Sequence, residues 1–98
     1  MNIEKVCKEN EITMCVSGRL DTTTAPALET AVSEVVGCCE KLVLDFAGLE
    51  YISSAGLRVI LKAQKAMAAK GSMTLKNVNE TIMEIFEITG FSDILTIV

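Results

Sequence analysis

Alternating apolar and polar side chains mark the start of the chain, a period of two that is typical of β-strands. Segments 3–7 and 11–17 show this alternation around the polar stretch KENE, so we predict two strands joined by a turn. Segment 41–48 opens with a continuous aliphatic run, which is typical of a central strand. Segments 73–78 and 94–98 predict one further strand each.

Three other segments repeat apolar residues every three to four positions and therefore predict amphipathic helices. They span residues 25–36, 55–70 and 80–89. Residues that favour helix starts and stops lie at their ends: a proline in a first turn, an asparagine before one, and glycines after the last turns. These residues are Pro26, Gly37, Gly71, Asn79 and Gly90.

The predicted order of elements is β-β-α-β-α-β-α-β. This alternation of strands and helices predicts an α/β fold with a mixed, mainly parallel sheet flanked by helices. The chain has 98 residues, the usual size of one domain, and no linker-like stretch divides it. We therefore expect residues 1–98 to form a single domain.

Composition narrows the classes of function. With a net charge of −4, the chain lacks the overall positive charge that a nucleic-acid-binding domain needs. Apolar runs are short and the charged N-terminus lacks the apolar core of a signal peptide, so we expect no membrane span and a cytoplasmic location. The 4 cysteines form no Cys-x-x-Cys motif and histidine is absent, so we expect no metal, no cofactor, and reduced cysteines that serve as small apolar residues.

Two adjacent serines, Ser53 and Ser54, lie between the central strand and the second helix. Because the carboxyl ends of parallel strands meet at one edge of a sheet, we expect these hydroxyls where partners bind. A serine here can cap the helix, or it can accept a phosphate, which the positive helix end stabilises. Asp45, interpreted as the end of the strand, either satisfies loop N–H groups or holds the Ser54 hydroxyl, and the structural role is favoured.

An enzyme is not expected. The chain has no histidine to act as the base for a serine nucleophile. Neither Gly-x-Ser-x-Gly nor the phosphate-binding Gly-x-x-x-x-Gly-Lys-Ser/Thr occurs. The serine turn is therefore interpreted as a cap or as a target of modification.

The stretches GRLDTTTAPALE, LVLDFAGLEYISSAGLRVIL and IFEITGFSDILTIV together resemble the STAS domain, specifically the stand-alone bacterial anti-sigma factor antagonists. The resemblance implies a protein that binds an anti-sigma factor with serine kinase activity and so frees a sigma factor. It also implies that the kinase phosphorylates the antagonist on a serine, which breaks the complex, and that a serine phosphatase restores it. The alternative is a STAS scaffold or adaptor that is never phosphorylated. We expect a monomer.

Matched residue by residue, the resemblance implies Ser54 as the phosphorylation site, which would both cap the helix and accept phosphate. Ser53, where the family often has aspartate, is the second choice. Asp21 matches a family acid in the loop that faces the partner, and we expect it to be exposed with little structural load. Arg19 stands where glutamate is common.

A row of basic residues on the second helix is interpreted equally well as a solvated face or as part of a docking surface. This row consists of Arg58, Lys62 and Lys65. A glycine in the first turn of the same helix is expected only where the backbone must approach a neighbour closely. The expected partner-binding residues are Asp21, Thr22, Ser53, Gly56, Arg58 and Lys62.

Overall fold

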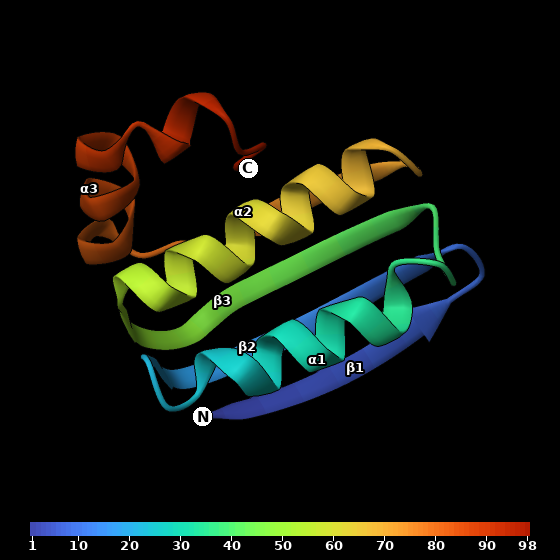
Figure 1. The fold of residues 1–98 in the computed structure, drawn as a ribbon, viewed down its shortest axis with the longest axis horizontal. Helices are drawn as coiled ribbons and strands as arrows, with labels where there is room; N and C mark the ends of the chain where they lie inside the picture. Colours follow the sequence, from blue (N-terminus) through green and yellow to red (C-terminus); the bar gives the residue numbers. More distant parts are fainter.

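The computed structural model describes all of residues 1–98 as one α/β domain with a four-stranded sheet (Figure 1). This confirms the predicted fold class. The elements are β1 (Asn2–Lys8), β2 (Glu11–Leu20), α1 (Ala25–Val35), β3 (Lys41–Ile52), α2 (Ser54–Ala68), β4 (Ser72–Lys76), α3 (Glu80–Thr89) and a short 3-10 helix (Phe91–Asp93).

The strands lie in the order β1-β2-β3-β4, and the sheet is mixed, as predicted. β1 and β2 form an antiparallel hairpin, whereas β3 runs parallel to both of its neighbours. Glu9 in the hairpin turn has a left-handed backbone, with φ of 50°. Because parallel strands need a crossover, α1 connects β2 to β3, and α2 connects β3 to β4.

One hydrophobic core joins the sheet to the helices. It contains 24 buried residues, which include alternate side chains of β2 and residues of all three α-helices. In Figure 1, α1 and α2 run side by side across the sheet, and both begin at the same end of the molecule. The predicted amphipathic faces are therefore the faces that the helices bury.

The predicted caps of α3 are confirmed. The side chain of Asn79 accepts a hydrogen bond from the Ile82 N–H at 2.9 Å, which satisfies one of the free donors of the first turn. Gly90 ends the helix with a left-handed backbone, φ 82°, that residues with a side chain rarely adopt. No helix of the chain has both the length and the apolar composition required to cross a bilayer.

Two strand predictions are wrong in extent. Segment 94–98 is not a strand of the sheet, since only Ile97 forms an isolated parallel bridge, to Leu75. The N–H groups of Ile94 and Leu95 donate back to the Phe91 carbonyl, so only the last three residues pair with β4, through the bonds of Thr96 and Val98 to Leu75. β3 continues to Ile52, beyond the predicted end at residue 48, because β2 pairs with it as far as Leu20. Asp45 therefore lies within β3 and does not end it.

Close packing at the junction between β3 and α2 explains the glycine in the first turn of the helix. A Cβ atom added to Gly56 would lie 2.7 Å from Leu20 Cγ and 3.0 Å from Ile52 Cγ1. Leu20 and Ile52 are both buried, so neither side chain has free space into which to move. The expectation of a close backbone approach is confirmed.

We predict that Gly56→Ala destabilises the domain by about 1–3 kcal/mol, the usual effect of overpacking a core. Urea unfolding followed by circular dichroism measures the change. Gly37→Ala is the matched control, because a Cβ there meets nothing within 4 Å. It should change stability by no more than about 0.5 kcal/mol. Equal effects of the two substitutions would contradict the packing argument.

Candidate functional site

The parallel pairing of β2 and β3 brings the two predicted site segments to one edge of the sheet. Leu20 pairs with Ile52 at the ends of these strands, and the N–H of Ser53 donates to the Leu20 carbonyl at 2.8 Å. The turn that follows β2 (residues 21–24) therefore lies beside the first turn of α2. This edge is where the predicted residues converge.

Ser53, and not Ser54, caps α2. The Ser53 side chain accepts a hydrogen bond from the Gly56 N–H at 3.3 Å, and its carbonyl accepts from the Leu57 N–H at 2.9 Å. The prediction that Ser54 caps the helix is wrong because the helix begins at residue 54, one position earlier than expected. Ser54 is exposed, and its hydroxyl makes no hydrogen bond within the chain.

Asp21 organises the turn before α1. Its Oδ1 accepts hydrogen bonds from the Thr23 N–H at 3.0 Å, the Thr23 hydroxyl at 2.7 Å, and the Thr24 N–H at 3.1 Å. The Thr24 hydroxyl donates to the Arg19 carbonyl at 2.8 Å, which fastens the turn to β2. The expectation that Asp21 carries little structural load is wrong, because its carboxylate supplies the acceptors that the turn needs. Thr22, between these residues, is exposed.

The same hydrogen bonds favour the charged form of Asp21. The bond from the Thr23 hydroxyl lowers the pKa of the Asp21 carboxyl, and the bonds from the backbone of Thr23 and Thr24 add to it, outweighing burial. Hydrogen bonds to a charged acceptor are stronger than those to a neutral one. The turn therefore holds a carboxylate at neutral pH.

Asp45 does not contact Ser54. Its Oδ1 accepts hydrogen bonds from the Ala47 N–H and from the Asn77 side chain, each at 3.0 Å, and Lys76 lies 3.9 Å from Oδ2. Burial opposes the charge of this carboxyl, but the hydrogen bonds and Lys76 outweigh it and lower its pKa. The favoured structural role of Asp45 agrees with these contacts.

A shallow groove lies between α1 and α2, next to Ser54. It has a volume of about 310 Å³ and is lined by Thr22, Ala25, Pro26, Glu29, Ala55, Arg58, Val59 and Lys62. Lys62 spans it and pairs with Glu29 at 3.1 Å, a contact that spacing within one helix cannot reveal. Both side chains are largely exposed, so the pair adds little stability.

The remaining predicted site residues differ in their exposure to solvent. Arg58, Lys62 and Lys65 are exposed on α2, whereas Gly56 is buried and can only position the turn. Sequence reasoning did not find that the Arg19 guanidinium lies 4.3 Å from the centre of the Tyr51 ring, a cation–π contact. Tyr51 lies opposite Arg19 on β3, so the contact depends on the register of the two strands.

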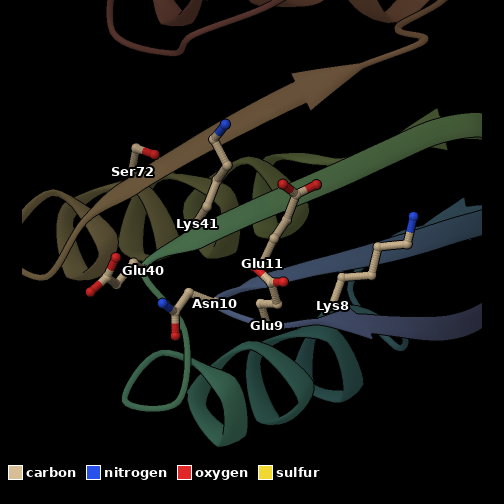
Figure 2. A pocket seen from close by; sticks show the side chains of 7 residues that line it. All are labelled: Lys8, Glu9, Asn10, Glu11, Glu40, Lys41 and Ser72. Carbon is tan, nitrogen blue, oxygen red and sulfur yellow. The ribbon is translucent and has the colours of Figure 1, made fainter.

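The largest opening lies at the opposite edge of the sheet. It has a volume of about 700 Å³ and is lined by Lys8, Glu9, Asn10, Glu11, Glu40, Lys41 and Ser72 (Figure 2). Most of these side chains extend from the hairpin turn and the strand starts into solvent, and their charges are of both signs. Such a set is typical of a solvated surface, and it lies at the amino ends of β3 and β4, away from Ser54.

Comparison with known proteins identifies the family to which this chain belongs. The STAS domain family matches residues 2–98, so the chain belongs to this family. The anti-sigma-B factor antagonist of Listeria monocytogenes is 36% identical over 103 residues, covering 99% of this chain and 90% of the relative. The anti-sigma-B factor antagonist of Bacillus subtilis is 29% identical over 98 residues, with coverage of 99% and 90%.

Solved structures of the same class share the fold. An anti-sigma factor antagonist from Mycobacterium paratuberculosis superimposes with a TM-score of 0.89 at 23% identity, covering 98% of this chain and 83% of the other. The Bacillus cell fate determinant SpoIIAA in its phosphorylated form gives a TM-score of 0.78 at 17% identity, with coverage of 99% and 91%. The two relatives are thus named as anti-sigma factor antagonists, and the likeness to these solved structures extends over nearly the whole domain.

We predict that Asp21→Asn lowers the urea midpoint of unfolding most strongly near pH 7. The pKa of Asp21 is lower in the folded chain than in the unfolded one, where it is about 3.9. Its stabilising contribution is therefore present above about pH 4 and is lost as the pH falls through the folded pKa. The difference between wild type and variant should shrink toward zero once the pH has fallen below the folded pKa of Asp21.

Thr22→Ala is the control for this titration, because Thr22 is exposed and next to Asp21. It should show no difference that depends on pH. If the effect of Asp21→Asn stayed constant as the pH fell from 7 through the acid range, the hydrogen-bonded carboxylate would not be the source of the stability.

Proposed function

We propose that this protein is an anti-sigma factor antagonist that binds an anti-sigma factor serine kinase, frees a sigma factor, and is switched off by phosphorylation at Ser54. The observation that carries the proposal is the exposed hydroxyl of Ser54, which no hydrogen bond engages, at the edge beside the Asp21 turn. The family and the anti-sigma factor antagonists among its relatives support the partner class.

The different surroundings of the two serines support Ser54 over Ser53 as the acceptor. The Ser53 oxygen is engaged in capping α2, and the residue is half-buried. In the proposed transfer, Ser54 Oγ forms a bond to the terminal phosphorus of ATP while the bond to ADP breaks. The hydroxyl proton passes to a base of the kinase. A serine phosphatase would hydrolyse the ester and restore the hydroxyl.

The position of Ser54 at the first turn of α2 supports a switch that leaves the fold intact. A phosphate adds about −1.5 to −2 charges, and the positive end of the helix stabilises an anion there. The partner must approach Ser54 closely to modify it, and after transfer it also holds the charged nucleotide product. Like charges brought together at an interface cost several kcal/mol, and each ~1.4 kcal/mol lowers affinity tenfold.

We predict that the cognate kinase with ATP adds one phosphate to Ser54, because its hydroxyl is the accessible one. Mass spectrometry of proteolytic fragments locates the modification. Ser54→Ala should abolish it, whereas Ser53→Ala should keep it although the lost cap lowers stability by about 1 kcal/mol. A phosphate on Ser53 would reject the assignment. Normal partner binding without any phosphorylation would favour the scaffold alternative.

We predict that phosphorylation weakens partner binding by about a hundredfold or more, a size that charge repulsion can supply. Calorimetric titration of the partner with the free and phosphorylated protein measures this ratio. Amide NMR shifts should change only in the first turn of α2 and the adjacent turn, and Ser54→Asp should reproduce the loss in part. Unchanged affinity, or shifts throughout the sheet, would overturn the electrostatic mechanism.

A further inference from the structure

Arg58 lies on the same face of α2 as Ser54. The two residues are four positions apart in one continuous helix, which places them about one turn from each other. Side chains on a helix lean toward its N-terminus, so the long Arg58 side chain leans toward Ser54. Both residues are exposed, and Arg58 lines the groove that Ala55 and Thr22 also border.

Arg58 has no acidic partner. The ion pairs of the chain join Lys62 to Glu29 and Lys76 to Asp45. The first turn of α2 contains no acidic residue that could neutralise Arg58. A guanidinium without a counter-ion, one turn from an accessible hydroxyl, is suited to bind an anion attached to that hydroxyl.

The other basic groups near this edge are already engaged. Lys62 is eight positions from Ser54 and is held by Glu29 at 3.1 Å. Arg19 lies over the Tyr51 ring, 4.3 Å from its centre. Among the basic side chains near this edge, Arg58 is therefore the one without a partner in the chain.

We infer that Arg58 binds the phosphate carried by Ser54 through a charge-assisted ion pair within α2. The inference rests on the proposed function for the presence of the phosphate. It adds a second action to the switch: phosphorylation places negative charge at the edge of the sheet and also removes Arg58 from the cations that face the partner.

The test is a phosphorus-31 NMR titration of the full chain with phosphoserine incorporated at position 54 during synthesis. A phosphoserine loses its second proton with a pKa of about 6, and a bound guanidinium lowers this value by favouring the dianion. Arg58→Gln should raise the pKa of the phosphate by about 0.3 unit or more relative to the wild-type chain, an effect in the range of an exposed charge pair. Arg58→Lys should restore part of the shift.

Lys65→Gln is the matched control, since it removes the same charge from the same helix. Lys65 is exposed and eleven positions from Ser54, about 16 Å along the helix axis at about 1.5 Å per residue. This exceeds the Debye length of about 8 Å at physiological salt, so the pKa of the phosphate should stay within about 0.1 unit. Equal shifts from Arg58→Gln and Lys65→Gln, or no shift from either, would overturn the inference.

The titration separates this inference from the proposed function because it uses neither kinase nor partner. If the kinase fails to modify Ser54 but the pKa shift is seen, the proposed function fails and the ion pair stands. If the kinase modifies Ser54 and Arg58→Gln leaves the titration unchanged, the proposed function stands and the ion pair is rejected.

Discussion

The parallel pairing of β2 with β3 is the constraint on which the candidate site depends. It runs from Glu11 and Lys41 to Leu20 and Ile52, with two register irregularities along the way. These shifts let a strand of 10 residues accompany one of 12 residues to the same edge. A slip of one residue would exchange buried and exposed faces, and the Ser53 N–H would no longer meet the Leu20 carbonyl.

The two neighbouring serines differ in what their hydroxyls do: one caps a helix, and the other, to which the proposed function assigns the switch, is exposed. Ser53 satisfies a free N–H at the start of α2, so its oxygen is committed to the fold. Ser54 has an exposed hydroxyl that makes no hydrogen bond within the chain. The same division holds across the edge, where Asp21 supports its turn and the adjacent Thr22 is exposed. A change at Ser54 or Thr22 alters the surface, while the hydrogen bonds of the neighbouring Ser53 or Asp21 keep the local backbone conformation.

Much of the fold could be predicted from periodicity, because most elements bury one face. The hairpin, the three helices and the Asn79 cap follow from side-chain pattern and capping chemistry alone. The last residues of β3, 49–52, could not be predicted, since they do not alternate and the strand is held there by pairing with β2. The final segment 94–98 has strand-like composition, but the N–H groups of Ile94 and Leu95 turn back to Phe91, and the segment forms a single bridge.

The location of the candidate site in the fold could be predicted more readily than the contacts that its residues make. Family motifs and strand order place the serines at the sheet edge, and the structure brings the Asp21 turn beside them. The identity of the serine that caps α2 depends on where the helix begins. The helix begins one residue before its predicted start, a difference that is common at helix ends. Partners from distant elements, such as Glu29 for Lys62, have no signal in local spacing.

The location of Ser54 in the first turn of a regular helix also limits the enzymes that can act on it. Many modifying enzymes bind their targets as extended peptides, but the backbone of this residue is already committed to α2. An enzyme that acts on Ser54 in the folded chain must accommodate a helix end together with the adjacent turn. A short peptide with the same sequence lacks the contacts of Ser53 with Leu20 and cannot hold this shape. Under the proposed function, specificity for Ser54 would reside in the folded surface, and substrate searches based on peptide libraries would miss it.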